Sequence, residues 1–325
     1  MQRLGIKERG GSSLIHDKNE LENFLRQLDL AISEEICAGS SSSDEDEDIE
    51  EPTTPISPLF DKSFYRNIKK ALIVPGGSCC NTIKGIASLG EKCGLIGKIG
   101  RDSSGRYYKE SMSMRGVIPL MTEDAHHRTG EVTCLITPNG ERTMKAFLGA
   151  SLQMTENDLL PQDFAGVKLL HVEGYSIYNQ PLTFRAMQLA KQNNSMVSFD
   201  LGSFELVRQF KTTVLDMLKN YVDIVFANSE EARELLNEPK STNTRDVAEK
   251  CADYLAKYCK VAVVMMGKDG CWVKSGNEKY ACPADVVANP IDTTGAGDLF
   301  AAGFLYGYLQ GYTLQQCARL GSLSG

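Results

Sequence analysis

The sequence predicts an α/β protein built on a doubly wound, mostly parallel sheet. In the second half of the chain, short apolar runs rich in β-branched residues alternate with longer runs of helical periodicity. The expected strands are 169–172, 196–199, 222–226 and 261–266. The expected helices between them are 181–193, 204–219, 229–237 and 245–258. This alternation is typical of parallel strands joined by helices that cover both faces of a sheet.

Residues 129–146 follow a different pattern, with two short β-rich runs on either side of Asn139-Gly140. Asn-Gly is a frequent two-residue turn between antiparallel strands. We therefore expect a β-hairpin here, forming a small β lid that excludes water from a site on the sheet.

The first 59 residues divide into two parts. Apolar residues at helical spacing between 17 and 36 predict an amphipathic helix, and we assign residues 1–37 to a partial N-terminal lid region. Residues 38–59 are acidic and contain few apolar side chains, so packing could not offset the entropy lost on ordering. We expect a disordered insertion there, a solvated loop extension, with a phosphorylated tract or a partner-binding segment as alternatives. The core then spans 60–325.

Composition narrows the class of protein and its surroundings. The net charge of −7 is accounted for by the acids of the 44–51 tract, so the rest of the chain is near neutral and offers no basic patch for nucleic acid. The start of the chain does not resemble a signal peptide, and no run of about 18 apolar residues could cross a membrane. The ten cysteines lack a Cys-x-x-Cys pair, as expected for reduced thiols. We expect a cytoplasmic protein.

The segment Asp292-Thr-Thr-Gly-Ala-Gly-Asp298 leads from a glycine-rich turn directly into an apolar helix. Such a turn lets the backbone amides of Gly295, Ala296 and Gly297 point together at the positive end of a helix, which favours an anion such as phosphate. Asp298 in the first helical turn would repel that anion, and its presence is explained if it accepts a proton from an attacking hydroxyl. The alternative is an ordinary turn whose acid stabilises the helix start.

This segment closely resembles the C-terminal signature of the ribokinase-like (PfkB) family of carbohydrate and nucleoside kinases. The resemblance implies a ribokinase-like fold and ATP-dependent phosphotransfer to an alcohol, with Asp298 as the catalytic base and residues 295–297 as the anion hole. It also implies Mg²⁺ as a cofactor, and a monovalent cation such as K⁺ near Asp292. Walker-A and protein-kinase HRD signatures are absent from the sequence.

A second element, Pro75-Gly-Gly-Ser-Cys-Cys-Asn-Thr-Ile-Lys-Gly85, lies between an expected strand and a helix. Its glycines allow close approach of a ligand to the backbone, and the amide of Asn81 can both donate and accept hydrogen bonds. It is similar to the family's N-terminal element, which implies that Gly76, Gly77 and Asn81 bind substrate hydroxyls. We expect these contacts to lie apart from Asp298.

Two weaker resemblances follow expected strands. Asn228 and Glu231 match the family's N-x-x-E element, which implies Mg²⁺ and phosphate binding, partly through water; the alternative is an acidic helix start. Gly267 and Gly270 resemble a nucleotide-side glycine turn, together with Thr294; the alternative is a plain hairpin turn. Adjacent His126 and His127 suggest a surface loop rather than a metal site, because neighbouring side chains on a strand point in opposite directions.

The form of the second element, Gly-Gly-Ser-x-x-Asn-Thr, is closer to adenosine and other nucleoside kinases than to ribokinase or fructokinase. We therefore expect the γ-phosphate of ATP to pass to a primary hydroxyl of a ribonucleoside. The alternatives are a sugar kinase of the ribose or fructose class and a catalytically silent protein that binds a ligand or a partner. The resemblance also implies an opening strand and a C-terminal end that this chain lacks. We expect a monomer or homodimer with small-molecule partners.

Overall fold

The computed structural model describes residues 12–15, 73–136, 142–284 and 293–325. The expected N-terminal helix, the acidic insertion and Asp292 lie outside these residues. The chain divides into two compact units, which are described separately. The first contains Met1–Pro75, Gly97–Ser111 and Met121–Gln153, and the second contains Gly76–Ile96, Met112–Leu120 and Met154–Gly325.

The second unit is built on a six-stranded sheet in the order β11-β10-β9-β8-β7-β6. Its strands are β6 (Leu169–Glu173), β7 (Met196–Asp200), β8 (Ile224–Asn228), β9 (Val261–Met265), β10 (Cys271–Ser275) and β11 (Glu278–Cys282). Strands β6 to β9 pair in parallel, as predicted, whereas β10 and β11 add an antiparallel edge. The sequence interpretation gave no range for a strand after residue 266, although it kept a plain hairpin turn at 267–270 as an alternative. The structure shows that turn leading from β9 into antiparallel β10.

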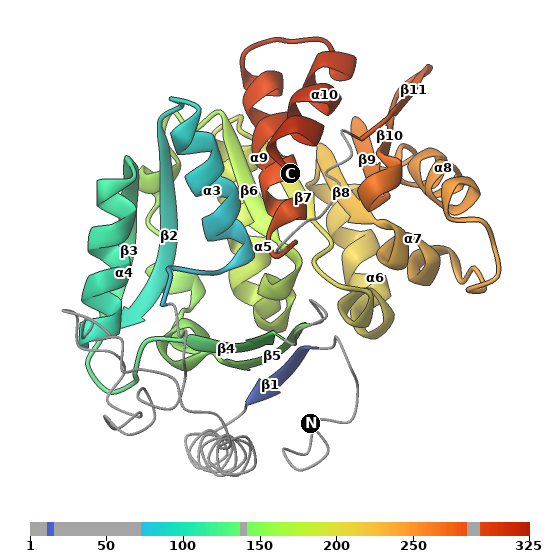
Figure 1. Cartoon of the computed structure of the whole chain (residues 1–325). Helices are drawn as coiled ribbons and strands as arrows, with labels where there is room; N and C mark the ends of the chain where they lie inside the picture. The colour runs from blue at the N-terminus through green and yellow to red at the C-terminus, as the bar shows by residue number, and fades with distance from the viewer. Residues whose placement is uncertain (1–11, 16–72, 137–141, 285–292) are drawn as a thin grey trace, which may run out of the picture. The chain divides into compact units, whose positions relative to one another are not determined.

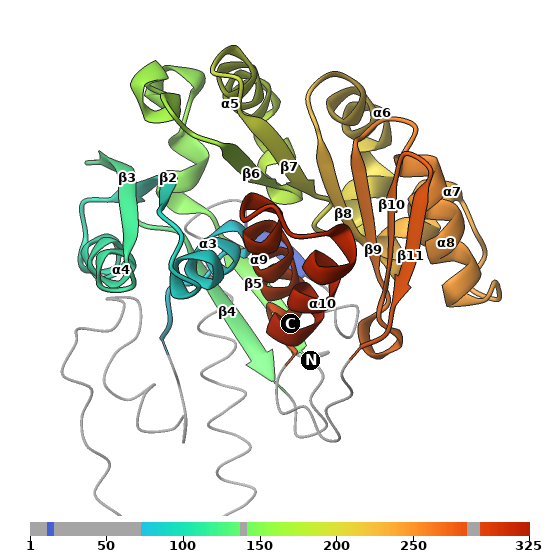
Figure 2. The same cartoon turned by 90° about the horizontal axis from the view of Figure 1, so that it is seen from above.

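Helices cover both faces of this sheet, which confirms the doubly wound arrangement (Figure 1). Helices α5 (Gln180–Gln192), α6 (Phe204–Asn220), α7 (Ser229–Leu236) and α8 (Thr244–Leu255) lie along one face. Helices α3 (Ser78–Ser88), α9 (Ala296–Leu309) and α10 (Leu314–Ser324) lie along the other (Figure 2). The core lies between these layers, where β7, β8 and β9 are nearly continuous apolar strands whose side chains are buried except at the strand ends.

Local sequence determines where the helices of the first face begin. The side chain at each N-cap position accepts a hydrogen bond from an amide in the first turn, which satisfies a donor that has no partner within the helix. These caps are Asn179, Ser203, Asn228 and Asn243. On the opposite face, α3 packs closely against α9. A Cβ atom added to Gly85 would lie 2.6 Å from the Cβ atom of Ala302, so only glycine permits this approach.

Trp272, the single tryptophan of the chain, lies on β10 at the antiparallel edge. The guanidinium carbon of Arg245 lies 5.7 Å from the centre of its ring, and the ammonium nitrogen of Lys279 lies 5.3 Å from it. Lys279 also pairs with Glu249 and Asp253 of α8. Cation–π contacts and ion pairs thus connect the edge hairpin to α8.

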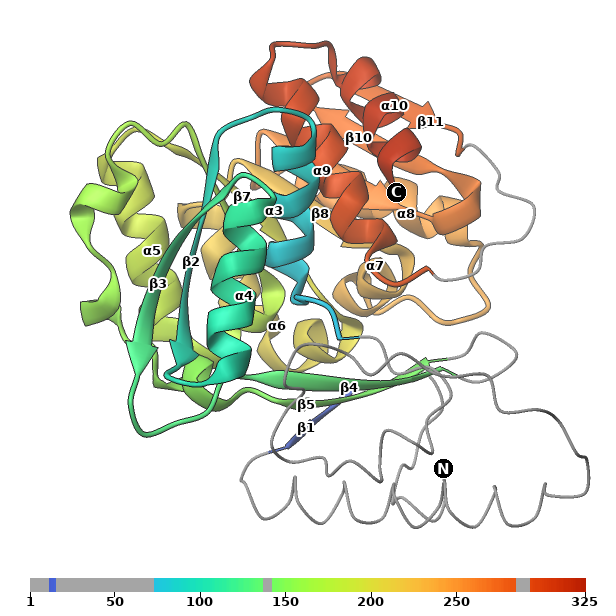
Figure 3. The ribbon, with the colours of Figure 1, turned by 60° about the vertical axis from the view of Figure 1, so that its left-hand side comes forward.

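The first unit contains a three-stranded sheet of β1 (Ser12–Ile15), β5 (Arg142–Phe147) and β4 (Glu131–Ile136), in that order (Figure 3). Strands β4 and β5 are antiparallel and lie where the sequence predicts a hairpin, and β1 adds in parallel to β5. Strands β2 (Cys93–Gly100) and β3 (Val117–Asp124) form a two-stranded sheet. These two strands and α4 (Ser103–Met114) each include residues of both units.

No helix in the described ranges is both long and apolar enough to span a bilayer. The structure records no disulfide bond among the nine cysteines found there.

Candidate active site

Asp298 lies in the first turn of α9, and the start of α3 provides the donors that hold it. Ser78 Oγ donates to Asp298 Oδ1 at 2.7 Å, and Asn81 Nδ2 donates to Asp298 Oδ2 at 2.9 Å. Thr82 Oγ1 donates to the main-chain oxygen of Asp298 at 3.2 Å. The two glycine-containing elements of the sequence therefore meet although Asn81 and Asp298 are 217 residues apart. The expectation that Asn81 lies apart from Asp298 is wrong.

Glycines shape the backbone on both sides of this contact. Gly77 precedes α3 with φ +106°, and Gly295 precedes α9 with φ +80°, conformations that L side chains rarely adopt. A Cβ atom at Gly295 would lie 3.3 Å from Asn81 Nδ2 and 3.5 Å from Asp298 Oδ2, so its absence leaves room beside the carboxylate. Gly76 is exposed, and a Cβ added to it would meet no atom of the described residues within 4 Å other than those of its chain neighbours.

The amides expected to bind an anion lie at the start of α9, as the sequence predicts. Ala296 N–H donates to the main-chain oxygen of Thr293 at 3.2 Å, so this amide is engaged within the turn itself. Residues 295–297 are half-buried and Thr294 is exposed. The positive end of the helix dipole lies at the same point, which favours an anionic group there.

Two further carboxylates, Glu173 and Asp200, end the neighbouring strands β6 and β7, where they are paired in register. Glu173 Oε2 accepts the amide of Cys79 in the first turn of α3 at 2.7 Å. The sequence interpretation did not single out either acid as a site residue. A sequence signal for both acids was available. Each directly follows an apolar run, and glycine comes one residue after Glu173 and two residues after Asp200. Such acids are candidates for a site because open α/β sheets bind ligands beyond the carboxyl ends of their strands.

Acidic side chains are concentrated at this edge of the sheet. Burial raises the pKa of Glu173, and the charge of Asp298 adds to the effect despite the hydrogen bond from Cys79. Burial, together with the charges of Asp298 and Glu173, raises the pKa of Asp200 to about 7. The causes of both pKa shifts are burial and neighbouring acids, and no cationic side chain of the described residues contributes to either. The edge could therefore attract a cation, and with it an anionic phosphate group.

Asn228 and Glu231, the expected Mg²⁺ residues, interact with each other at the start of α7. Glu231 Oε2 accepts the main-chain amide of Asn228, and Glu231 Oε1 accepts its side-chain amide, both at 2.7 Å. Glu231 is only 2% exposed, and burial, followed by the charge of Asp200, raises its pKa well above the usual range. Both carboxylate oxygens thus have donors, which fits a role through bridging water better than direct coordination. The described residues contain no group of three or more potential metal ligands.

Gly267 and Gly270 flank the turn from β9 to β10, and structural constraints differ between them. Gly270 has φ +87°, and an added Cβ would lie only 2.0 Å from the main-chain oxygen of Cys282. The close packing against β11 is therefore sufficient to require glycine at position 270. Gly267 is exposed with φ +56°, and an added Cβ would meet no atom of the described residues within 4 Å other than those of its chain neighbours. Among the described residues, packing therefore does not require glycine at position 267.

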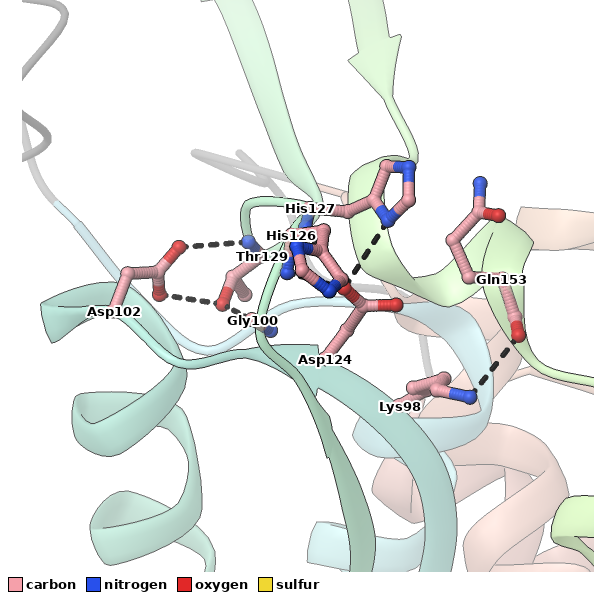
Figure 4. A network of polar contacts seen from close by, with 8 residues as sticks. All are labelled: Lys98, Gly100, Asp102, Asp124, His126, His127, Thr129 and Gln153. Atoms are coloured by element: carbon pink, nitrogen blue, oxygen red, sulfur yellow. Dashed lines mark hydrogen bonds and ion pairs between the residues drawn. The ribbon is translucent and has the colours of Figure 1, made fainter.

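The loop after β2 in the first unit is held by Asp102 (Figure 4). Asp102 accepts the amide and the hydroxyl of Thr129 at 2.8 and 2.6 Å, and the amide of Gly105 at 2.8 Å. Burial alone would raise its pKa, but these hydrogen bonds lower the pKa of Asp102 overall. A Cβ at Gly105 would lie 2.4 Å from the main-chain oxygen of Gly100. The contacts of Asp102 and Gly105 are thus those of a loop held in place by its own side chains.

His126 and His127 are exposed in the same unit (Figure 4). Asp124 Oδ1 accepts both of their main-chain amides and contacts His127 Nδ1 at 3.1 Å. This arrangement is a surface turn, as the sequence predicts.

Comparison with known proteins identifies relatives of two kinds. The sequence profile of the pfkB family carbohydrate kinases matches residues 67–325. A fructokinase of Salmonella typhimurium is 31% identical over 73% of this chain and 77% of its own length. An uncharacterized sugar kinase of Archaeoglobus fulgidus is 28% identical over 73% of this chain and 91% of its own.

The solved structures that resemble this chain are also kinases. The adenosine kinase of Sinorhizobium meliloti is 31% identical with a TM-score of 0.73, covering 80% of this chain and 79% of that chain. A probable sugar kinase of Rhizobium etli is 32% identical with a TM-score of 0.73, covering 80% of this chain and 78% of that one. These matches confirm the resemblance and the ribokinase-like fold predicted from the sequence. The chain belongs to the pfkB family of carbohydrate kinases, which are phosphotransferases that act on hydroxyl acceptors.

Proposed function

We propose that this protein transfers the γ-phosphate of ATP to a primary hydroxyl of a ribonucleoside, with Asp298 as the general base. The observation that carries the proposal is the position of the Asp298 carboxylate. It lies at the positive end of α9 and is held by Ser78 and Asn81 beside the carboxyl ends of β6 and β7. A base at this point can accept a proton while the helix end stabilises the phosphoryl group.

In the proposed reaction, Asp298 accepts the proton of the substrate hydroxyl as its oxygen attacks the γ-phosphorus atom. The bond from this phosphorus to the β–γ bridging oxygen breaks, and ADP leaves with that electron pair. The amides of Gly295 and Gly297 and the dipole of α9 favour the charge on the transferring group, and Gly76, Gly77 and Asn81 orient the acceptor. Catalysis then depends mainly on positioning and electrostatics.

ATP would lie along the carboxyl edge of the sheet, with Thr294, Gly267 and Gly270 on the nucleotide side. Mg²⁺ suits the site because it prefers oxygen ligands and keeps part of its water shell. The raised pKa values of Asp200 and Glu231 fit a place where positive charge is needed. Asn228 and Glu231 would hold the ion through water, and the ion would offset the charge of the phosphates. A K⁺ site near Asp292 falls outside the described residues.

The choice of a ribonucleoside rests on the Gly-Gly-Ser-x-x-Asn-Thr element and on the likeness to the Sinorhizobium adenosine kinase. The fructokinase relative of Salmonella favours a second candidate, a hexose kinase. Small molecules are the proposed partners, and we propose a cytoplasmic monomer or homodimer.

A coupled assay for ADP with adenosine, D-ribose and D-fructose as acceptors tests the substrate. We expect kcat/KM for adenosine to exceed that for either sugar by at least about tenfold, or about 1.4 kcal/mol. Equal or better use of D-fructose would favour the hexose kinase.

Asp298→Asn tests the base. The amide cannot take up the proton, so kcat should fall by at least about a hundredfold. Binding of ATP, measured by calorimetry, should stay within about tenfold. Asp246→Asn, an exposed acid in the first turn of α8, is the matched control and should leave kcat unchanged. A folded Asp298→Asn protein whose kcat falls less than about fivefold, with chemistry rate-limiting, would exclude this residue as the base.

A further inference from the structure

We propose that Ser78 is a positioning residue that orients the Asp298 carboxylate and keeps it charged, an inference that rests on the proposed role of Asp298. Ser78 stands at the first position of α3 and is half-buried. Its hydroxyl lies 2.7 Å from Asp298 Oδ1, while Asn81 Nδ2 lies 2.9 Å from Asp298 Oδ2. Each carboxylate oxygen therefore receives one donor from the same helical turn.

Two donors on two oxygens fix the plane of the carboxylate, whereas one donor leaves the group free to rotate about its last side-chain bond. A carboxylate oxygen can accept more than one hydrogen bond, so the bond from Ser78 does not by itself prevent Oδ1 from accepting a bond from a substrate hydroxyl. The Ser78 hydroxyl can thus orient Asp298 while the carboxylate acts as a base.

The acidic residues around Asp298 give the Ser78 hydroxyl a second effect, which acts on the ionisation of Asp298. Glu173 and Asp200 lie close enough for the charge of Asp298 to raise the pKa of each. The same repulsion opposes the negative charge on Asp298, and a hydrogen bond to the ionised form favours that charge. Ser78 and Asn81 therefore counteract the neighbouring acids at the one group that must be ionised to accept a proton.

The donors on α3 lie along one stripe of the helix. Ser78, Asn81, Thr82 and Gly85 are spaced three and four residues apart, and all of them face α9. Thr82 Oγ1 holds the main chain of Asp298, and Gly85 sets the distance between the helices. The position of the Ser78 hydroxyl is therefore set by the packing of two helices, as positioning requires.

The test compares Ser78→Ala, which removes the donor, with Ser78→Thr, which keeps a hydroxyl. Ser88→Ala makes the same serine-to-alanine change at the exposed end of α3 and serves as the matched control. The Ser88 hydroxyl donates to the main-chain oxygen of Lys84 within the same helix. Steady-state kinetics would give kcat and KM from pH 5 to 9, with adenosine as the first acceptor and D-fructose as the second. Carbon-13 NMR of aspartate labelled at the carboxyl carbon, with Asp298→Asn to assign the signal, would follow the ionisation of Asp298 directly.

For Ser78→Ala we expect kcat to fall about tenfold or more while KM for ATP changes less than about threefold. The acidic limb of the kcat profile and the NMR titration of Asp298 should both move to higher pH. Ser78→Thr should retain the wild-type limb, and Ser88→Ala should match wild type throughout.

An unchanged titration of Asp298 in Ser78→Ala would overturn the proposal, as would equal losses of kcat in the alanine and threonine variants without a pH shift. These outcomes differ from failure of the proposed function. In that case Asp298→Asn would retain activity, or wild type would phosphorylate neither acceptor, and the NMR titration would still decide the role of Ser78.

Discussion

Gly85 provides a quantitative test of how α3 and α9 are held together. In Gly85→Ala, the new Cβ atom would lie 2.6 Å from the Cβ atom of Ala302 and 3.2 Å from Leu299 Cδ2. Carbon atoms in contact normally lie about 3.5–4.0 Å apart. The helices must therefore separate, or the substitution must distort one of them.

Two opposing effects determine the magnitude. Alanine is favoured over glycine within a helix by about 1 kcal/mol, which alone would stabilise the variant. Overpacking of a well-packed contact costs about 1–3 kcal/mol. Because the clash is between two Cβ atoms that cannot rotate away, we expect the upper part of this range, and a net loss of about 1–2 kcal/mol in the free energy of unfolding.

Urea denaturation followed by circular dichroism measures this loss. A double-mutant cycle with Ala302→Gly isolates the contact, because removing the opposing methyl should relieve the clash and give a favourable coupling energy of at least about 1 kcal/mol. Separation of the helices would also draw Ser78 and Asn81 away from Asp298, so kcat should fall as well. A Gly85→Ala protein that is about 1 kcal/mol more stable than wild type would refute the close approach of these helices.

Two further predictions concern a buried histidine and the turn between β9 and β10. Burial lowers the pKa of His171 to about 4, so below pH 6.5 the unfolded chain takes up a proton that the folded protein does not, and stability falls. Between pH 7.5 and 5, the free energy of unfolding of wild type should fall by about 2 kcal/mol relative to that of His171→Gln, measured by urea denaturation at each pH. A stability difference between the two proteins that does not change with pH would contradict this. Gly270→Ala should cost more than about 2 kcal/mol because its Cβ would meet Cys282, whereas Gly267→Ala should cost about 1 kcal/mol from its positive φ alone. Equal melting temperatures for these two variants would argue against the packing of the turn.

The parallel strands could be predicted because a strand buried on both faces is a nearly continuous apolar run. Strands β10 (Cys271–Ser275) and β11 (Glu278–Cys282) are only five residues long, and neither is a continuous apolar run or a strict alternation of apolar and polar residues, so both are difficult to recognise from sequence. Sequence motifs predicted Asp298 and Asn81 separately. Their contact across 217 residues depends on how α3 packs against α9, which no local pattern contains.

The environment of the acids at the strand ends likewise could not be predicted from local sequence. Glu173 and Asp200 become neighbours only when β6 and β7 pair in register, and their raised pKa values arise from burial and from charges on other elements. Glu231 was recognised through a motif, but its hydrogen bonds to Asn228 follow from the start of α7. Sequence patterns thus identified residue types suited to the chemistry, while the fold determines which of them share a charge environment.

The placement of Trp272 has a consequence for spectroscopy. Since it is the only indole of the chain, all tryptophan emission comes from the antiparallel edge, two residues beyond the turn that ends at Gly270. Arg245 and Lys279 flank the ring, and a change in either cation would alter the field acting on the excited indole. Fluorescence would therefore report events at the turn between β9 and β10, while opening of the α3–α9 contact would leave the emission spectrum unchanged and would need a separate probe.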